Sequence, residues 1–487
     1  MNSCIRRSGV GLVLVLAVLA GCAVGPNYKQ PTINTPGNYR FAPGQTTNSF
    51  GDLPWWEVFQ DPMLQDLIRT ALTNNYDLKQ AVARVEQARQ QVTVARSPLF
   101  PEIGYGGDVG RGRNAAFNAP AALNGATDSS AQVNLNAAWE IDLWGRIRRA
   151  TESARAELVA SEEGRRAVIL SLVGAVAGSY VNLRDLDRQL EIARETAKSR
   201  GESLEIFKLR FEGGFSSEVE YVQVKSLYEE ALAVIPAVEK AITLQENALC
   251  VLLGRNPGPI PRGKTIDQLT LPAIPAGLPS DLLARRPDIL RAEQNLVAAN
   301  ARIGVAKAAY FPTIGLTGFF GSASTDLSKL FTGPAQVWSY SAPITMPIFT
   351  AGKIAGDVQA AEAIQRQALA GYRQAIQGAF REVDDALADQ ARTREQLAAQ
   401  GRQVEALQKY VELAQLRFDN GYTSYLEVLD AQRTLFNVQL SYTQNQGVLF
   451  QALINLYKAM GGGWVTEADR LTAGATGPAP KAPPAGK

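Results

Sequence analysis

Two segments of the chain alternate strictly between apolar and polar residues. Residues 133–143 do so in the first half, and residues 338–348 do so in the second half. A period of two over about a dozen residues is typical of a β-strand with one apolar and one polar face. Such strands suit the wall of a membrane barrel, with lipid on one side and water on the other. Pro343 and Pro347 are expected to weaken the far end of the second strand.

The remainder of each half follows helical periodicities. Residues 64–96 have helical spacing, with Asp61-Pro62 as N-cap and first turn and Phe100-Pro101 as the end. From residue 146 to residue 211 the chain has no proline and carries a heptad register of apolar residues, which recurs in the second half up to residue 418. A helix of this length spans about 100 Å, so it must pack along a neighbour or form part of a tube.

We expect a turn and a second helix after each long helix. Gly213-Gly214 and Asn420-Gly421 interrupt the helical pattern, and Ser217 and Ser424 follow them as N-caps. The second helices are predicted to return antiparallel and to have a length similar to that of the first. The two turns are then the parts of the hairpins that lie farthest from the strands.

The second half of the chain repeats the first. Within residues 97–104, the last seven recur at 309–315 with a shift of 211, and residues 209–217 recur at 416–424 with a shift of 207. The stretch between the repeats is rich in Pro and Gly, and the last residues are small, polar and Pro-rich. The predicted segments are a signal peptide (1–21), an extended arm (22–60), a first repeat (61–255), a linker (256–279), a second repeat (280–464) and a disordered tail (465–487).

The first residues have the features of a bacterial lipoprotein leader. Arg6 and Arg7 precede an apolar run over residues 9–20, which is too short to cross a bilayer as a helix. The run ends in Leu19-Ala20-Gly21-Cys22, which resembles the lipobox, in which the leader is removed and the cysteine is acylated. An ordinary signal peptide with an incidental cysteine is the alternative. In similar lipoproteins an Asp directly after the cysteine favours retention in the inner membrane. Ala23 stands at that position here, which favours the outer membrane.

Composition and charge narrow the function further. Of the 487 residues 46% are apolar and 20% are charged, and the net charge of +2 gives no reason to expect a nucleic-acid partner. The chain has no histidine, so it lacks the commonest general base and metal ligand. Cys250 lies in an apolar run and is interpreted as a small buried hydrophobe. Outside the leader no stretch offers about 20 consecutive apolar residues, so any membrane crossing is expected to use β-strands.

Six stretches, taken in order along the chain, match one known family. They are Val24-Gly25-Pro26-Asn27-Tyr28, Trp139-Glu140-Ile141-Asp142-Leu143-Trp144-Gly145-Arg146, Arg285-Arg286-Pro287-Asp288-Ile289, Pro347-Ile348-Phe349-Thr350-Ala351-Gly352, Leu429-Asp430-Ala431-Gln432-Arg433 and Leu456-Tyr457-Lys458-Ala459-Met460-Gly461-Gly462-Gly463-Trp464. With the lipobox and the repeat, they make the chain up to Trp464 resemble the TolC-like outer-membrane factors. The resemblance is strongest to the OprM-type (NodT-like) lipoproteins of resistance-nodulation-division efflux systems.

The resemblance implies a fold, a function and partners. The fold would be mainly α, with long coiled-coil helices forming a trimeric α-barrel and four strands per protomer joining one shared transmembrane β-barrel. The function would be that of a multidrug exit duct in the outer membrane, lipid-anchored and with a long periplasmic extension. The partners would be two further copies of the chain, outer-membrane lipid, a periplasmic adaptor (membrane fusion) protein and an inner-membrane pump of the resistance-nodulation-division class.

The resemblance also places a periplasmic gate just after the second turn. By position, the gate and selectivity residues are Leu426, Glu427, Asp430 and Arg433. The leucine would form an apolar ring, and three copies of each carboxylate would form rings that favour cations. Their spacing puts the three charged residues on one broad helix face. A solvated helix charge is the alternative for each of them.

Two further positions complete the predicted gate. Arg417 and Phe418 fall where similar proteins have contacts that tie the helices together at the gate. In the first repeat the positions matching the two carboxylates hold Glu220 and Gln223, so only the second repeat carries the second acidic residue. This difference predicts an asymmetric gate.

Two other functions were weighed against the duct. The first is a lipid-anchored coiled-coil tether across the periplasm that conducts nothing, and such a tether has no need of the alternating strands. The second is an enzyme with paired carboxylates such as Asp384 and Asp385. These two are sequence neighbours on one helix and point in different directions, so they do not form a catalytic pair. We expect no catalytic residues, no cofactor and no metal.

Overall fold

The computed structural model describes residues 23–41, 60–113, 127–269, 280 and 282–461. The described chain forms two compact units. Of the described residues, the first unit comprises 23–32, 84–113, 127–161 and 291–372, and the second comprises 33–41, 60–83, 162–269, 280, 282–290 and 373–461. The expected lipid site at Cys22, the leader and the C-terminal tail lie outside the described residues.

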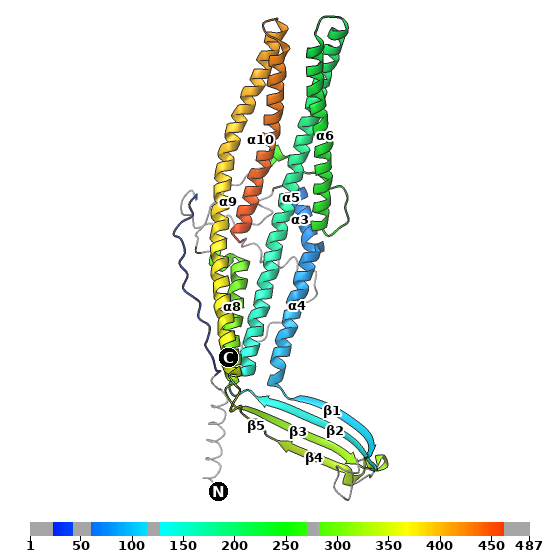
Figure 1. Cartoon of the computed structure of the whole chain (residues 1–487), viewed down its shortest axis with the longest axis vertical. Coiled ribbons are helices and arrows are strands. Elements are labelled where there is room, and N and C mark those ends of the chain that lie inside the picture. Colours follow the sequence, from blue (N-terminus) through cyan, green and yellow to red (C-terminus); the bar gives the residue numbers. More distant parts are fainter. Residues whose placement is uncertain (1–22, 42–59, 114–126, 270–279, 281, 462–487) are drawn as a thin grey trace. The chain divides into compact units, whose positions relative to one another are not determined.

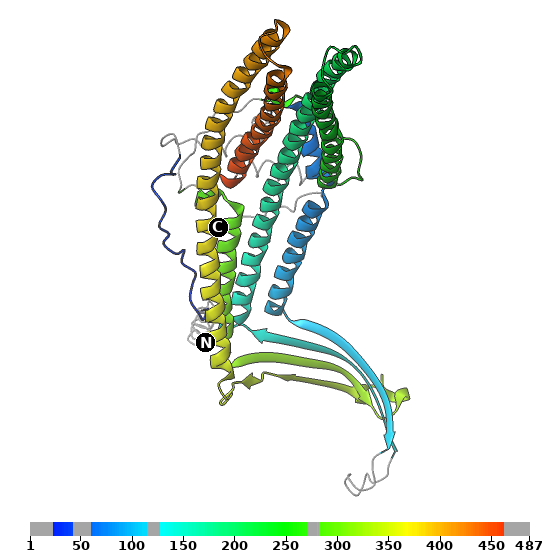
Figure 2. The ribbon, with the colours of Figure 1, turned by 45° about the horizontal axis from the view of Figure 1, so that its top comes forward.

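The first unit contains an antiparallel sheet in the order β1-β2-β3-β4, with β5 also paired to β3 (Figures 1 and 2). The strands are β1 (Glu102–Arg113), β2 (Thr127–Ile141), β3 (Thr313–Ser324), β4 (Gln336–Ser341) and β5 (Ile344–Thr345). Short 3-10 helices flank them: η2 (Ser97–Leu99), η6 (Leu327–Lys329) and η7 (Gly333–Ala335). Within the described residues β1 and β4 are edge strands, since each pairs with one neighbour only.

The two alternating segments form strands as predicted, with one interruption. The first lies in β2, which ends two residues earlier than the alternation does. The second is divided into β4 and β5, because Pro343 has no N–H to donate to the ladder. The carbonyl of Pro343 still accepts a hydrogen bond from the Gly315 N–H at 2.9 Å, so the chain stays beside β3. The strand ends at Thr345, ahead of Pro347.

The apolar face of this sheet is exposed. A row of four directly opposed apolar side chains crosses the strands β1 to β4: Tyr105, Leu135, Phe320 and Trp338. Their exposed fractions are 89%, 54%, 53% and 67%, so no described element of the chain covers them. A soluble β-sandwich buries such a face against a second sheet, and the described residues provide none.

Helices continue from the strands in the first unit. They are α4 (Tyr76–Arg96), α8 (Pro287–Ala308) and the first turns of α5 (Arg146–Glu212) and α9 (Lys353–Asp419). Arg302 of α8 forms an ion pair with Glu157 of α5 at 2.5 Å, and the Thr151 hydroxyl of α5 donates to the Ala95 carbonyl of α4 at 3.3 Å. The start of α5 therefore packs against α4 and α8.

The arm that follows the predicted lipid site is held tightly in the first unit. Arg149 is buried and donates to the Val24 carbonyl at 3.2 Å and to the Asn27 Oδ1 at 2.7 Å. Gly25 has a φ of 100°, and a Cβ there would lie 2.5 Å from the Cα of Gly304 on α8. The close approach of these two backbones therefore requires glycine at residue 25.

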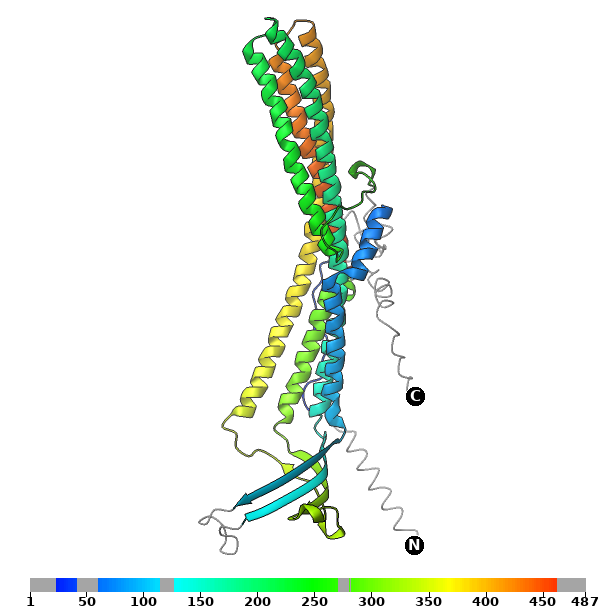
Figure 3. The ribbon, with the colours of Figure 1, turned by 90° about the vertical axis from the view of Figure 1, so that its right-hand side faces the viewer.

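The second unit is helical. It contains α3 (Pro62–Asn74), α6 (Glu218–Leu252), η4 (Ile266–Gln268), α7 (Leu282–Arg285), α10 (Tyr425–Ala459) and the larger part of α5 and α9. Figure 3 shows α5, α6, α9 and α10 side by side, and one apolar cluster joins residues of all four. Cys250 is fully buried in α6, as predicted.

The long helices match the prediction, and their partners do not. The helices α5 and α9 have 67 residues each and cover the two predicted segments. The returning helices α6 and α10 have 35 residues each, so the prediction of a similar length is wrong. They end early because Gly254 and Gly461 adopt left-handed backbone conformations, with φ of 67° and 82°, which a helix cannot continue through.

The predicted helix over residues 64–96 is divided into α3 and α4 at Asn75. Asp61 caps α3 as predicted, since its carboxylate accepts from the Met63 N–H at 2.9 Å. Asn75 is buried, donates to the Leu252 carbonyl at 2.9 Å and accepts from the Leu78 N–H at 3.0 Å. It therefore caps α4 and attaches this helix to the end of α6.

One described helix is long and apolar enough to cross a membrane. The helix is α5, and 61% of its most apolar window is buried within the protein. This degree of burial is typical of a core helix, so it does not change the expectation that strands make the crossing.

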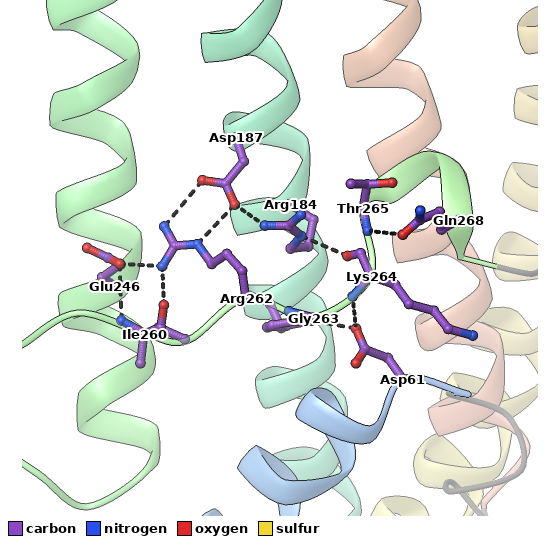
Figure 4. Close-up of polar contacts among 11 residues, drawn as sticks. Asp61, Arg184, Asp187, Glu246, Ile260, Arg262, Gly263, Lys264, Thr265 and Gln268 are labelled. Atoms are coloured by element: carbon purple, nitrogen blue, oxygen red, sulfur yellow. Dashed lines mark hydrogen bonds and ion pairs between the residues drawn. The ribbon is translucent and has the colours of Figure 1, made fainter.

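The linker after α6 is fixed to the helices of the second unit (Figure 4). Asp61 is fully buried and accepts hydrogen bonds from the Tyr180 hydroxyl and the Lys264 N–H, both at 3.0 Å. The Gly263 N–H donates to the same hydroxyl at 2.8 Å. Burial raises the pKa of Tyr180 to about 12, so the hydroxyl keeps the proton that it donates to Asp61.

Charged side chains hold the linker at a second point. Arg262 donates to both carboxylate oxygens of Asp187 on α5, at 3.0 and 3.2 Å, and to Glu246 on α6 at 2.5 Å. Arg184 donates to Asp187 at 2.5 Å and to the Lys264 carbonyl at 2.8 Å. Residues 260–268 are thus tied to α3, α5 and α6 by polar contacts (Figure 4).

Candidate gate at the helical hairpin turns

The two hairpin turns have the same backbone. In the first, the Phe215 N–H donates to the Arg210 carbonyl at 2.7 Å, and Gly214 has a φ of 77°. In the second, the Tyr422 N–H donates to the Arg417 carbonyl at 2.9 Å, and Gly421 also has a φ of 77°. Both are Schellman motifs, in which a left-handed glycine satisfies the last carbonyls of a helix.

The first turn continues into α6 through a complete capping box. The Glu220 N–H donates to the Ser217 hydroxyl at 3.3 Å, and the Ser217 N–H donates to the Glu220 carboxylate at 3.0 Å. Each side chain thereby satisfies a backbone N–H that has no partner within the helix. Ser217 is therefore an N-cap as predicted.

The second turn uses its matching glutamate differently. Ser424 occupies the N-cap position, yet its side chain makes no capping hydrogen bond. Glu427 forms an ion pair with Arg417 at 3.0 Å and accepts a hydrogen bond from the Thr423 hydroxyl. The carboxylate is directed back across the turn to the end of α9, so it joins the two helices of the hairpin.

The remaining predicted gate residues lie together on the next turn of α10. Asp430 and Arg433 form an ion pair at 2.6 Å, with side chains 53% and 55% exposed. They share with Leu426 a groove of about 240 Å³ between α6 and α10, which is lined by Gln223, Ser226, Leu227, Leu426, Leu429, Asp430 and Arg433. Glu427 does not line this groove, so the structure separates the two carboxylates.

Each predicted carboxylate has an arginine partner. Glu427 is paired with Arg417, and Asp430 is paired with Arg433. These four side chains together carry no net charge in one copy of the chain. A cation-selective ring of carboxylates would therefore require that at least one of these pairs open. The pore roles of these residues stay a prediction.

Phe418 lies in an aromatic cluster that the sequence pattern did not single out. Its ring lies 4.8 Å from that of Tyr425 and 6.2 Å from that of Phe207. The guanidinium of Arg210 lies over Phe418 at 5.7 Å. Burial raises the pKa of Tyr425. The cluster ties α5, α9 and α10 together just below the turns; its heptad positions were visible in the sequence, but its aromatic contacts were not.

Arg200 and Asp185 are two of the buried charged residues of α5 that lie away from the turn, and the sequence did not single out either as a site residue. Arg200 is 4% exposed, donates to Glu230 at 3.1 Å and lies over the Phe436 ring at 5.0 Å. Burial lowers the pKa of Arg200. Asp185 is 6% exposed, and burial raises its pKa to about 6. Arg200 occupies a position of the apolar heptad register, which was a sequence signal for its burial, whereas no sequence signal distinguishes Asp185 from the solvated charges of the same helix.

A comparison with protein families identifies the chain. The family described as outer membrane efflux protein matches residues 67–255 and 278–462. The chain is similar to the solvent efflux pump outer membrane protein SrpC of Pseudomonas putida, with 39% identity over 93% of this chain and 97% of that protein. It is also similar to the cation efflux system protein CusC of Escherichia coli, with 35% identity over 92% of this chain and 97% of that protein.

Solved structures show the same fold. The open state of the outer membrane channel MtrE of Neisseria gonorrhoeae superimposes with a TM-score of 0.83, at 32% identity over 91% of this chain and 98% of that chain. The fold is thus the mainly helical one of outer-membrane efflux channels, with long helices and a small number of antiparallel strands. The chain belongs to the outer membrane efflux protein family. It is an outer-membrane channel through which an efflux system exports small molecules.

Proposed function

We propose that the chain is the lipid-anchored exit duct of a tripartite multidrug efflux pump and that it works as a homotrimer. The observation that carries the proposal is the exposed apolar row across β1 to β4 in a sheet with two edge strands. Lipid is the medium that such a face suits. A sheet of this size is too small to close into a barrel alone, so strands from three copies would complete it.

The helices supply the periplasmic part of the proposed duct. Two hairpins per chain and three chains give a tube of pseudo-sixfold symmetry. The adaptor protein and an inner-membrane pump of the resistance-nodulation-division class would deliver substrate to this tube, and the chain itself would catalyse no reaction. Acyl chains on Cys22 would anchor each copy in the outer membrane.

The second hairpin turn is the proposed gate. Leu426, Asp430 and Arg433 line the groove beside α6, and Glu427 would act through its ion pair with Arg417. Phe418 would hold α9 against α10 through its contact with Tyr425. Opening would part the ion pairs and present the carboxylates to the pore, where they would favour cations.

Conductance of the purified protein in planar bilayers tests the proposal. The double variant Glu427→Ala/Asp430→Ala is compared with the wild type, and Glu220→Ala in the first turn serves as the matched control. We expect small cation-selective steps for the wild type and a loss of selectivity or wider opening for the double variant. Glu220→Ala should leave selectivity unchanged.

Two outcomes would contradict parts of the proposal. If the wild type is folded and trimeric yet never conducts, the chain is a periplasmic tether. If it conducts and the double variant keeps the same selectivity, the gate lies elsewhere. Mass spectrometry that finds an uncleaved and unmodified N-terminus would remove the lipid on Cys22.

A further inference from the structure

The return helices of the two hairpins end in the same way. Leu252 ends α6 and Ala459 ends α10, and each is followed two residues later by a left-handed glycine. A Cβ at Gly254 would lie 2.4 Å from the Asn74 carbonyl oxygen, and one at Gly461 would lie 2.8 Å from the Cγ of Arg286. The base of the first hairpin is therefore packed against the last residue of α3, and the base of the second is packed against the residue that precedes α8.

A side chain at matching positions of the two repeats bonds the end of each return helix. In the first repeat Asn75 donates to the Leu252 carbonyl at 2.9 Å. In the second repeat Arg286 donates to the Ala459 carbonyl, also at 2.9 Å. The same backbone contact is thus made by a neutral amide in one hairpin and by a guanidinium in the other.

The guanidinium makes two contacts that the amide cannot make. Arg286 directly precedes α8 and is bound to Asp288 in the first turn of that helix at 2.6 and 2.9 Å, and to Glu382 on α9 at 2.7 Å. The position that matches Glu382 in the first repeat is Ala175, which carries no charge. At this contact, among the described residues, the long helix of the second hairpin therefore has an ion pair that the long helix of the first hairpin lacks.

The two carboxylates differ in how easily they can leave Arg286. Asp288 is two residues away along the chain, so it accompanies the arginine in any position of α9. Burial alone would raise the pKa of Asp288, but its hydrogen bonds with Arg286 bring that pKa below the ordinary value, so this partner stays charged. The Glu382 side chain is 43% exposed and lies on a different helix. Loss of the Glu382 contact thus leaves the buried guanidinium paired, which avoids the large cost of an isolated buried charge.

From these contacts we infer that Arg286 is a positioning residue for the gate and that its ion pair with Glu382 is a releasable latch on α9. The inference rests on the proposed function. With the latch closed, α9 is held against the ends of α8 and α10. With the latch open, α9 is free to tilt while Asp288 keeps Arg286 in place. Arg417 lies about 50 Å further along the same helix, at 1.5 Å per residue, so a small tilt at the base displaces the gate residues.

Single-channel recording of three variants tests the latch. Glu382→Gln removes the charge of the latch and keeps its shape. Asp385→Asn is the matched control, because it removes a carboxylate from α9 whose partner is Arg381, at 3.8 Å, rather than Arg286. Asn75→Ala removes the neutral contact of the first hairpin and controls for general loosening of the fold.

We expect Glu382→Gln to raise the fraction of time spent open about threefold, as for a two-state equilibrium that loses one partly exposed ion pair. Asp385→Asn should behave like the wild type. Asn75→Ala should lower the Tm without changing the open fraction. If Glu382→Gln does not assemble, Glu382→Asp keeps the charge at a shorter reach, and its open fraction should lie above that of the wild type.

The outcomes separate the latch from the duct. A conducting wild type with an unchanged Glu382→Gln variant would overturn the latch and leave the proposed function intact. Equal opening in Glu382→Gln and Asn75→Ala would also overturn it, because both would then act through loss of stability. A trimer of the wild type that never conducts would contradict the proposed function, and the latch with it.

Discussion

The two hairpin turns share a backbone and differ in the chemistry placed on it. The first closes on itself: Ser217 and Glu220 satisfy each other's N–H groups. The second leaves its N-cap side chain unused and sends Glu427 to Arg417 on the preceding helix. Because the Schellman motif already fixes both turns, the side chains of the second are free to make a contact between helices.

This difference shows which part of a repeated structure is free to specialise. A left-handed glycine and the last carbonyls of a helix determine the turn, and they recur unchanged in both repeats. The contacts at the base of the hairpins also combine a shared part with a part that differs. Asn75 and Arg286 both bond the last carbonyl of a return helix, and the arginine adds an ion pair with Glu382. In both places the second hairpin carries the contacts that can open.

The largest expected difference between the two hairpins concerns their matching phenylalanines. Phe418 packs in the aromatic cluster with Tyr425 and Phe207, so Phe418→Ala should lower the free energy of unfolding by about 2–3 kcal/mol. Phe211 is 38% exposed and, among the described residues, stacks on the ring of Tyr221 alone, so Phe211→Ala should lower the free energy of unfolding by about 1 kcal/mol. Unfolding of both variants by guanidinium chloride in detergent measures the difference between their free energies of unfolding. Equal losses would mean that the cluster does not hold the second hairpin more firmly than the first.

A second comparison uses the buried carboxylate of the first hairpin. Asp185 is buried, and its Oδ1 has no hydrogen-bond partner among the residues that the structure describes. The matching residue of the second hairpin is Arg392, which is exposed and paired with Glu395. Because burial raises the pKa of Asp185 to about 6 from 3.8, the folded state binds its proton more tightly than the unfolded state does. Stability therefore falls as the pH rises through the window from about 4 to 6.

Asp185→Asn should remove this dependence. At pH 7 the variant should be more stable than the wild type by about 2–3 kcal/mol, and the advantage should vanish below about pH 4, where the aspartic acid is neutral in both states. Thermal unfolding at a series of pH values measures the effect, with Arg392→Gln as the control that should show none in this window. A variant that is destabilised equally at every pH would contradict the assignment.

The smallest expected effect distinguishes the two N-caps. Ser217→Ala removes the hydrogen bond from the Glu220 N–H to the Ser217 hydroxyl, leaves the one from the N–H of residue 217 to the Glu220 carboxylate, and should cost about 1 kcal/mol. Ser424→Ala removes no side-chain hydrogen bond of the cap, so it should change stability by less than about 0.5 kcal/mol. Hydrogen exchange of the first turns of α6 and α10 would localise the change. Comparable losses at the two serines would show that Ser424 also caps its helix in solution.

The features that the sequence predicts well are those with a long, regular period. The heptads of α5 and α9 and the alternation of β2 require no knowledge of distant partners. The break at Asn75 could not be predicted, because its cause is a carbonyl 177 residues away. The length of α6 and α10 was predicted wrongly for a similar reason: the glycines that end them were visible, but their left-handed conformation depends on the segments packed against them.

The candidate gate also has features that the sequence predicts and features that depend on distant partners. The turn, its glycines and the set of charged residues follow from the repeat and the family resemblance. The pairing does not, because Glu427 and Arg417 are on different helices and spacing on one helix suggested a common face with Asp430 and Arg433. Thr423 was missed, since a hydroxyl in a turn gives no signal until its acceptor is placed.

The linker contacts determine the order in which the parts of the chain can fold during synthesis. Asp61 is fully buried, and one of its hydrogen-bond donors, the Lys264 N–H, lies 203 residues later. Until that donor arrives, burial of the carboxylate would leave it short of a partner, so it stays in water. We therefore expect the first repeat to complete its fold only after the start of the linker has left the ribosome. Until then α3 is not packed against α5. During synthesis from the N-terminus the first repeat would thus fold before the second, and the contacts of the linker would complete it.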